Sequence, residues 1–241
     1  MSMDGKIADE LDATLRLLWF PAKAKKRGPK PSHSLEEVLD AAIGIADRDG
    51  LSAVSMQRLA QELGFTKMAI YRYVPSRSAL IALMTDHAIG RPPATFNAET
   101  WRQRMEKWAS AVLFTFLCHP WGIEATTGQR IPGPCEIAWV EAGLVILADI
   151  GLDSASRLDV LAVITGHIRF TALQARGTGA TIGLEAESNA RMAHALGGRE
   201  LEFPQFSTAL LQTAAKRIKD DAMDFGLRCI LDGIERQIGA I

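Results

Sequence analysis

The stretch that most constrains this chain is residues 55–77, which contains two closely spaced helix starts separated by a glycine. Ser55 can cap a first helix, and Gly64 can end it. Thr66 can cap a second helix, so the turn between the two is about three residues long. A helix-turn-helix needs a turn of this length to set its helices at a steep angle. The spacing predicts such a pair, but it also suits an ordinary helical hairpin with a solvated basic face.

The second helix is predicted to expose side chains suited to duplex DNA. Lysine and arginine can donate to phosphates or base edges, tyrosines can hold the backbone, and apolar groups can touch a thymine methyl. None of the outward residues is acidic. They are Thr66, Lys67, Met68, Ala69, Tyr71, Arg72 and Tyr73.

Two further helices are expected to flank this pair. Ser34 and Glu37 form a capping-box pattern at the start of an amphipathic segment that stops at Gly50, so residues 34–74 should form a compact three-helix unit. Ser76 can cap a helix that runs to about Gly90 and connects this unit to the rest of the chain as a lever. Arg77 lies in the first turn of that helix, where it can reach a backbone phosphate.

A basic segment precedes the three-helix unit. The chain has a formal net charge of −1, yet residues 13–35 contain six Lys or Arg and no acid. Prolines at both ends of residues 21–33 oppose a regular helix, so an extended linker is expected there. Lys26, Arg27 and Lys30 surround an Arg-Gly-Pro sequence similar to arms that enter an A·T-rich minor groove. The alternative is a solvated charged linker. Before it, residues 4–20 suggest a short, partly ordered helix.

Composition excludes several classes of protein. The three cysteines, Cys118, Cys135 and Cys229, are widely spaced and form no CxxC pair, so reduced thiols and no metal site or cofactor are expected. An acidic N-terminus argues against a secretory signal, and no apolar run approaches 18 residues. We therefore expect a cytoplasmic protein without a membrane partner.

The sequence after Gly90-Arg-Pro-Pro reads as helical throughout, which predicts an all-α fold. The expected domains are an N-terminal extension (1–33), a DNA-binding domain with its lever (34–90) and a larger ligand-binding and dimerisation domain (91–241). Helices are expected at about 101–117, 135–150, 154–176, 185–196, 206–219 and 221–237, with a loop at 177–184. The helix over 154–176 is expected to be capped by Ser154.

Two glycines on the last helix suggest a homodimer. Gly226 and Gly233 lie seven residues apart, on one helical face, and would let a partner helix approach closely. The alternative is that they only ease packing within one chain. A dimer with two recognition helices implies a palindromic operator. The expected interface contains Leu158, Leu161, Thr165, Gly226, Ile230, Gly233 and Ile234.

Aromatic residues in the second half suggest a site for an apolar or planar small molecule, including a cationic one. For each aromatic residue taken alone, a place in the core is the alternative. The expected lining consists of Trp101, Met105, Trp108, Phe114, Leu117, His119, Trp121, Trp139, Ile168 and Gln174.

The sequence LAQELGFTKMAIYRYVPSRSAL, preceded by DAAIGIADRDGLSAVSM, resembles the DNA-binding domain of the tetracycline-repressor (TetR) family. The stretches Cys-His-Pro-Trp-Gly, Ile-Thr-Gly-His-Ile and Phe-Gly-Leu-Arg-Cys-Ile-Leu-Asp-Gly-Ile-Glu are similar, more loosely, to the regulatory domain of the tetracycline repressors. The resemblance implies a dimeric, ligand-responsive repressor of an operator. It also implies DNA contacts from Ser55, Gln57 and Arg77, in addition to the outward residues of the second helix.

The resemblance also bears on the effector. His119 matches a histidine that helps hold a metal–drug complex in tetracycline-binding relatives, and His167 matches another histidine of the pocket region. Near the place of the drug-holding histidine, however, this chain has only Arg91-Pro-Pro. Neither tetracycline nor a metal is therefore expected, and His119 is expected to be a helix-end or pocket hydrogen-bonding residue.

Two other functions remain open from the sequence. An all-α enzyme is one, although no nucleophile elbow, phosphate loop or metal-spaced cluster is found. An architectural DNA-binding protein without an effector is the other, although DNA binding alone does not require the large aromatic half.

Overall fold

The computed structural model describes residues 3–20, 33–128, 130–176, 191–215 and 222–239. All regular elements among these residues are helices, which confirms the predicted all-α fold. By internal contacts the chain divides into two compact units, Met1–Ala148 and Asp149–Ile241. The predicted division at Gly90 therefore falls inside the first compact unit. As a boundary between functional domains it stays a prediction.

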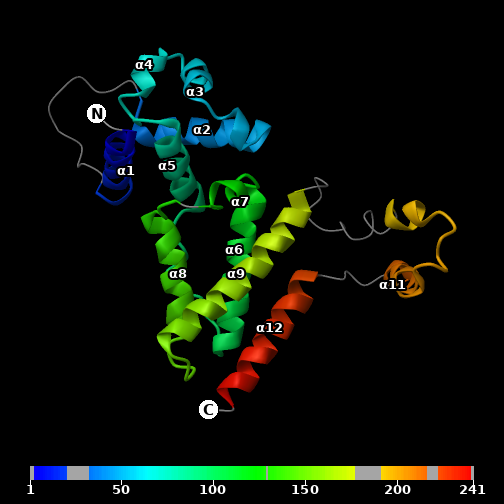
Figure 1. The fold of residues 1–241 in the computed structure, drawn as a ribbon. Coiled ribbons are helices and arrows are strands. Elements are labelled where there is room, and N and C mark those ends of the chain that lie inside the picture. Colours follow the sequence, from blue (N-terminus) through cyan, green and yellow to red (C-terminus); the bar gives the residue numbers. More distant parts are fainter. Residues whose placement is uncertain (1–2, 21–32, 129, 177–190, 216–221, 240–241) are drawn as a thin grey trace. The chain divides into compact units, whose positions relative to one another are not determined.

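The N-terminal part of the first unit has the predicted helices (Figure 1). Ser34 forms the predicted capping box, since its hydroxyl accepts from the Glu37 amide at 3.1 Å and its own amide donates to the Glu37 carboxylate at 2.6 Å. Gly50, with φ +83°, ends the helix. The elements are α1 (Met3–Trp19), α2 (Leu35–Asp49), η1 (Leu51–Ala53), α3 (Met56–Glu62), α4 (Lys67–Ile70) and α5 (Arg77–Ile89).

The turn between α3 and α4 has the predicted construction, although α4 is shorter than expected. Gly64 has φ +67°, and the Thr66 hydroxyl accepts from the Ala69 amide at 3.3 Å. After Ile70, the amides of Arg72 and Tyr73 bond three residues back, which tightens the chain into a turn. Pro75 favours this early end because the residue before a proline is disfavoured in helical conformation.

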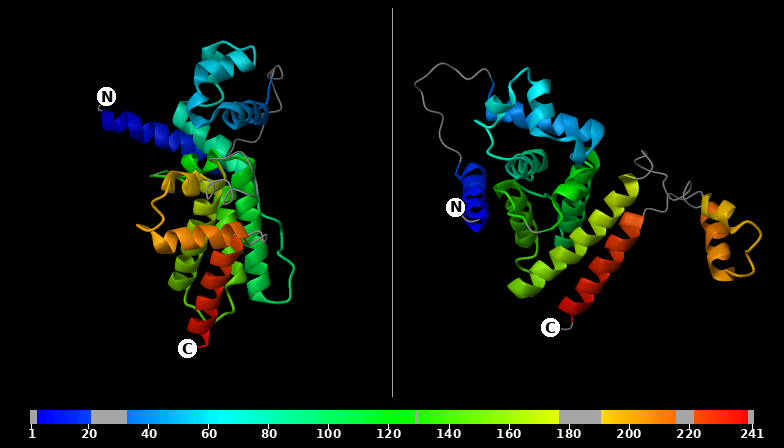
Figure 2. Two further views of the ribbon diagram at one scale, coloured as in Figure 1. Left: turned by 90° about the vertical axis from the view of Figure 1, so that its right-hand side faces the viewer. Right: turned by 45° about the horizontal axis from the view of Figure 1, so that its top comes forward.

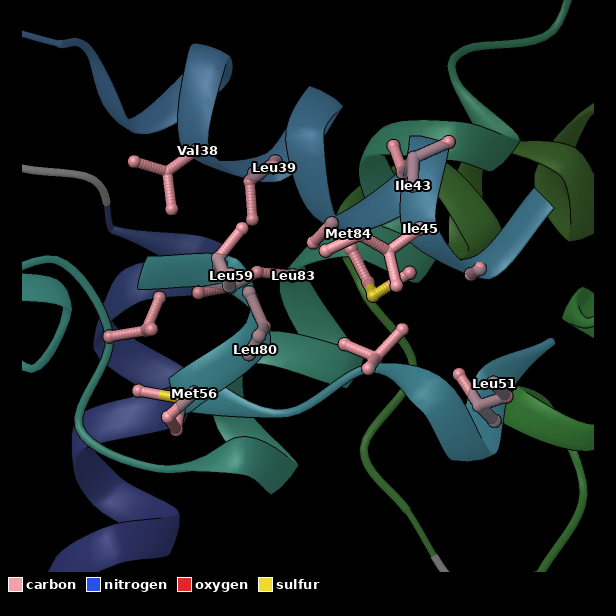
Figure 3. Close-up of a cluster of buried hydrophobic side chains, with 14 of the residues drawn as sticks. Val38, Leu39, Ile43, Ile45, Leu51, Met56, Leu59, Leu80, Leu83 and Met84 are labelled. Carbon is pink, nitrogen blue, oxygen red and sulfur yellow. The ribbon is translucent and has the colours of Figure 1, made fainter. Parts of the chain in front are cut away.

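One apolar core joins α2, α3 and α5 (Figure 3). Val38, Leu59 and Leu80 are fully buried in it. Helix α1 packs along α5 and buries Leu18 in this core. The helix expected at residues 4–20 is thus confirmed as part of the first unit.

The rest of the first unit consists of α6 (Trp101–Cys118), α7 (Gly122–Ala125) and α8 (Pro134–Ile146). Thr100 and Gln103 form a capping box at the start of α6. Helix α8 packs against both α5 and α6. It ends at Ile146, earlier than expected, and the chain turns before Gly151.

The second unit contains α9 (Ser154–Arg176), α11 (Pro204–Ala215) and α12 (Ala222–Ile238), and residues 191–196 are also helical. Helices α9 and α12 lie side by side (Figures 1 and 2). The cap of α9 is Asp153 and not Ser154, because the Asp153 carboxylate accepts from the Ser156 amide at 2.9 Å. This bond holds the pKa of Asp153 below its ordinary value. The predicted loop 177–184, and the parts 185–190 and 216–219 of two predicted helices, lie outside the described residues.

Candidate nucleic-acid interface and effector region

The face predicted to read DNA is largely present on α4. Ile70 is fully buried and holds α4 on the core; Ala69 before it is half-buried, and Tyr71 after it is exposed. Met68 is 72% exposed, and Lys67, Tyr71 and Arg72 are exposed as well. Helix α4 and the turn after it thus present two cations, one apolar group and one phenol beside an N-terminus capped by Thr66. Such a surface can contact phosphates and base edges together.

Tyr73 differs from its predicted outward position. Its ring is half-buried and stacks on Phe65 at a centroid distance of 6.1 Å, and its hydroxyl donates to the carbonyl of His33 at 3.0 Å. The His33 ring meets Phe65 edge-on at 4.9 Å. Tyr73 thus connects the chain before α2 to the turn that follows α4. The sequence contained a signal for this, because Tyr73 follows the inward Ile70 by three residues and so shares its helical face.

Three more predicted DNA-contacting residues surround α4. Ser55 caps α3, accepting from the Arg58 amide at 3.1 Å, and Gln57 is exposed in the first turn. Arg77 is exposed, but its guanidinium donates to the carbonyls of Val54 at 2.7 Å and Leu51 at 3.0 Å. Arg77 therefore joins α5 to the loop before α3, and a phosphate contact would use its remaining N–H donors. Lys26, Arg27 and Lys30 lie outside the described residues.

The residues predicted to bind an effector come from both compact units. Met105 and Trp108 are buried in α6, and the Trp108 indole donates to the Trp139 carbonyl at 3.0 Å. The Trp139 indole in turn donates to the Gly90 carbonyl at 3.0 Å, which ties α8 to the end of α5. Trp101 and Leu117 are half-buried. Ile168, which is buried, and Gln174, which is exposed, belong to the second unit.

Two members of this predicted set differ sharply in exposure. Phe114 is 66% exposed, and its place in a pocket wall stays a prediction. Trp121 is 2% exposed and belongs to the core that α2, α3 and α5 share, and it also lines the small cavity described below. Its position three residues after the end of α6 turns it back toward α2. For Trp121, a place in the core, which was the alternative, is confirmed.

His119 is a helix-end residue, which was one of the two roles predicted for it; the other was a hydrogen-bonding residue of the pocket. It caps the C-terminus of α6, where its amide donates to the Thr115 carbonyl at 3.1 Å. Its Nδ1 lies 2.9 Å from Oδ1 of Asp47 in α2, and the Trp121 indole donates to the same oxygen at 2.6 Å. Asp47 was not foreseen as a partner, because the contact joins residues far apart in sequence.

A small cavity lies beside this contact. Its lining comes from the end of α5, the end of α6 and the start of α7, and its volume of about 10 Å³ has room for roughly one water molecule. It is lined by Thr85, Ala88, Ile89, Thr115, Phe116, His119, Trp121 and Gly122.

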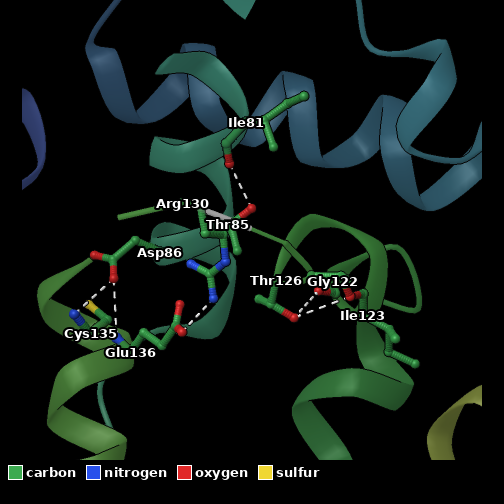
Figure 4. Close-up of polar contacts among 10 residues, drawn as sticks. Ile81, Thr85, Asp86, Gly122, Ile123, Thr126, Arg130, Cys135 and Glu136 are labelled. Carbon is green, nitrogen blue, oxygen red and sulfur yellow. Dashed lines mark hydrogen bonds and ion pairs between the residues drawn. The ribbon is translucent and has the colours of Figure 1, made fainter. Parts of the chain in front are cut away.

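A second unforeseen contact joins the lever α5 to α8 (Figure 4). Asp86 is 8% exposed, and its Oδ1 accepts from the amides of Cys135 at 2.9 Å and Glu136 at 3.2 Å. A carboxylate at a helix N-terminus satisfies free amides and interacts favourably with the helix dipole. Burial, together with the Asp86 charge, raises the pKa of the Cys135 thiol to about 11. Arg130 pairs with Glu136 beside this cap.

Gly133 makes the approach of Asp86 possible. A Cβ atom at Gly133 would lie 2.1 Å from Oδ1 and 2.7 Å from Cβ of Asp86. The Gly-Pro pair at residues 133–134 signals a helix start, since proline is favoured at the first helical position. A sequence pattern of this kind does not reveal that the cap comes from the lever.

The predicted dimer residues fall on different faces of α9 and α12. A Cβ at Gly226 would lie 2.3 Å from Cε1 of His167, whose Nε2 bonds the Met223 carbonyl at 3.0 Å. Gly226 therefore serves packing within the chain, which was the alternative, and its predicted role at the interface is corrected. Leu161 and Ile234 are buried in the chain and are corrected likewise. Leu158 and Gly233 are exposed, and Thr165 and Ile230 are half-buried.

The described parts of the chain contain neither a membrane-spanning helix nor a metal-binding cluster. No helix there has both the length and the apolar content needed to cross a membrane. Within the same residues, no group of three or more His, Cys, Asp or Glu side chains is placed to hold a metal ion.

Comparison with known proteins gives a consistent result over both halves. Residues 38–84 match the model of bacterial regulatory proteins of the tetR family, and residues 93–238 match that of the tetracyclin repressor-like C-terminal domain. The HTH-type transcriptional repressor DrrR1 of Streptomyces coeruleorubidus is 35% identical over 162 residues, which are 66% of this chain and 60% of the relative. An HTH-type transcriptional regulator of Saccharopolyspora erythraea is 26% identical over 63% of this chain and 64% of its own length. The chain thus spans less than two thirds of these relatives.

Solved structures show the same fold. ActR of Streptomyces coelicolor, solved in complex with actinorhodin, is 21% identical with a TM-score of 0.71 and covers 87% of this chain and 100% of its own. TetR of Acinetobacter baumannii is 18% identical with a TM-score of 0.58, over 86% of this chain and 99% of its own.

Proposed function

Because this chain belongs to the TetR family of bacterial regulatory proteins, we propose that it is a ligand-responsive repressor that binds a palindromic operator as a homodimer in the cytoplasm. The observation that carries the proposal is the exposed surface of α4 and the turn after it, which presents Lys67, Tyr71 and Arg72 around the buried Ile70. The proposal assigns no catalytic role to the chain.

The effector is proposed to be a small apolar or aromatic molecule. Support comes from relatives of the same fold, since ActR was solved with actinorhodin and a variant of the Acinetobacter baumannii TetR with minocycline. The candidate residues are Trp101, Met105, Trp108, Phe114, Leu117, His119, Trp139, Ile168 and Gln174. Binding would bias the lever α5 and hence the recognition helices, and the ligand can shift this equilibrium only by its differential affinity for the two states.

A homodimer is proposed through the outer faces of α9 and α12. The apolar side chains Leu158, Val163 and Phe170 of α9 and Phe225 of α12 are each more than half exposed. Gly233 has no atom of its own chain within 4 Å of a built Cβ, which leaves room for a partner helix.

The central experiment is a gel shift on the DNA upstream of the protein's own gene, followed by release with compounds found in a thermal-shift screen. Binding with ligand-induced release supports a regulator, and binding that no compound reverses favours an architectural protein. Absence of specific binding contradicts the proposal.

Lys67→Ala and Arg72→Ala are each expected to weaken operator binding by roughly tenfold, within the range for a lost contact to bases or phosphates. Both side chains are exposed, so the melting temperature should stay unchanged. Fluorescence anisotropy on operator DNA measures the affinity. Arg228→Ala, which removes an exposed cation on α12, provides the control. Unchanged affinity in both α4 variants contradicts the assignment of α4.

Neutralising the basic segment with Lys26→Gln, Arg27→Gln and Lys30→Gln together is expected to reduce the salt dependence of operator binding. Each lost phosphate contact lowers the slope of log K against log salt by about 0.9. Substitution is preferable to truncation, because removing residues 1–30 would also remove α1, which buries Leu18 in the core. An identical slope would show that these residues do not contact phosphate.

A further inference from the structure

Asp47 receives two hydrogen bonds at one carboxylate oxygen. It lies in the last turn of α2, and its Oδ1 is 2.9 Å from Nδ1 of His119 and 2.6 Å from Nε1 of Trp121. The two donors follow directly on α6, and their rings lie 5.8 Å apart. Residues 119–125 form the α6–α7 corner. Asp47, on a helix of the DNA-binding part, thus binds two residues of this corner, His119 and Trp121.

This contact is not a loose surface pair. The Trp121 indole is 2% exposed, so its N–H requires an acceptor inside the protein, and Asp47 supplies a charged one. Ala125, at the other end of the α6–α7 corner, is also part of the core around α2 and α5. A packed core resists deformation, so the corner and α2 should move as one body.

Helix α2 transmits its position to the recognition helices. Arg48, beside Asp47, pairs with Glu62 of α3 at 2.8 Å, and Asp49 pairs with Arg58 of α3. The fully buried Leu59 and Ile70 place α3 and α4 on the same core. A shift of the α6–α7 corner would therefore reach α4 through α2 as well as through the lever α5, against which α7 also packs.

We infer that Asp47 is a positioning residue, which orients the DNA-binding helices by fixing α2 to the α6–α7 corner. The inference rests on the proposed function and adds a second connection to the lever, whose own contact to α8 is made by Asp86. Without Asp47 each DNA-binding unit samples more orientations. Only a fraction of these match two half-sites at once, and apparent affinity falls by that fraction.

The test compares two DNA duplexes. The operator is obtained by in vitro selection from random double-stranded DNA with the wild-type protein, and a second duplex carries only one half-site. Asp47→Ala is expected to lower the affinity for the full operator relative to the half-site by roughly fivefold, within the range found for residues that modulate coupling between sites. Binding to the half-site itself should stay unchanged, because it requires only one correctly folded unit.

Asp40→Ala is the matched control. Asp40 lies on the same helix and meets His87 of α5 at the same distance of 2.9 Å, but this contact does not involve the α6–α7 corner. It should leave the ratio of the two affinities unchanged. The isosteric Asp47→Asn, which keeps the shape and weakens the acceptor, serves if Asp47→Ala fails to fold, and it should lower the same ratio.

A double-mutant cycle identifies the contact responsible. Trp121→Phe removes the indole donor together with part of the buried ring volume and keeps an aromatic ring in the core, so it should lower the ratio less than Asp47→Ala. The combined variant should show no more than the effect of Asp47→Ala alone.

The outcomes distinguish failure of the role proposed for Asp47 from failure of the proposed function. An unchanged ratio in Asp47→Ala overturns the inference, and so does an equal loss on both duplexes, which would show plain destabilisation of the DNA-binding unit. Failure of the wild type to select any operator contradicts the proposed function instead.

Discussion

Gly133→Ala should destabilise the protein by roughly 3 kcal/mol, the largest effect expected of a glycine-to-alanine change among the described glycines. The new Cβ would lie 2.1 Å from Oδ1 and 2.3 Å from Cγ of Asp86. The backbone at Gly133 has φ −82°, which alanine adopts freely, so the cost is steric and not conformational. Asp86 would have to leave the N-terminus of α8, and the amides of Cys135 and Glu136 would lose their acceptor. Urea unfolding measures the change in free energy.

Gly44→Ala is the control for this variant. Gly44 lies inside α2, and its built Cβ meets only the flexible end of Arg48 at 3.4 Å, so alanine should be neutral or stabilise by up to about 1 kcal/mol. Asp86→Gly removes every atom that the new methyl meets. Gly133→Ala should therefore cost much less in that background, and strict additivity of the two changes would contradict the explanation.

Gly226→Ala is expected to destabilise the protein by about 2 kcal/mol, because helix α12 passes over the ring of His167 in α9 at that position. A Cβ there would lie 2.3 Å from Cε1 and 2.5 Å from Nε2 of His167. The ring is also held by its bond to the Met223 carbonyl, so it cannot swing away without losing that bond. Thermal and urea unfolding should both report the loss, and His167→Ala should suppress it.

Gly233→Ala separates packing within the chain from packing between chains. Its built Cβ meets no atom of this chain within 4 Å, so alanine should stabilise an isolated α12 by about 1 kcal/mol through helix propensity. If a partner helix crosses α12 at Gly233, the same change should instead weaken the dimer, which sedimentation equilibrium measures.

A Gly226→Ala variant as stable as wild type would show that α9 and α12 are not this close.

Local sequence signals predicted most of the helices correctly. The Ser34 capping box, the turn at Gly64 and the helix starts at Ser55 and Ser76 depend on residues within a few positions of one another, and the structure confirms each of them. The aromatic periodicity over residues 101–117 also predicted α6, because an apolar stripe at helical spacing marks a buried face.

The functional side chains were less predictable because their partners are distant in sequence. Periodicity shows that Trp121 belongs on a buried face, but not whether that face lines a pocket or the core around α2. The same limit applies to Gly226, where a small residue indicates close approach and cannot say which helix approaches. Asp47 and Asp86 carry no local signal at all, since their donors lie 72 and 49 residues away at the nearest.

The burial of Trp121 also sets where this protein could be cut and rejoined. A chimera that grafts residues 34–90 onto the regulatory half of another repressor would leave behind the indole that fills the core of the grafted part, together with the donors to Asp47. The vacated space would cost several kcal/mol, as truncation of a buried tryptophan does. The exchangeable module of this protein is therefore not its helix-turn-helix alone. It includes the α6–α7 corner, and an engineered sensor built from it should carry residues 119–125 along.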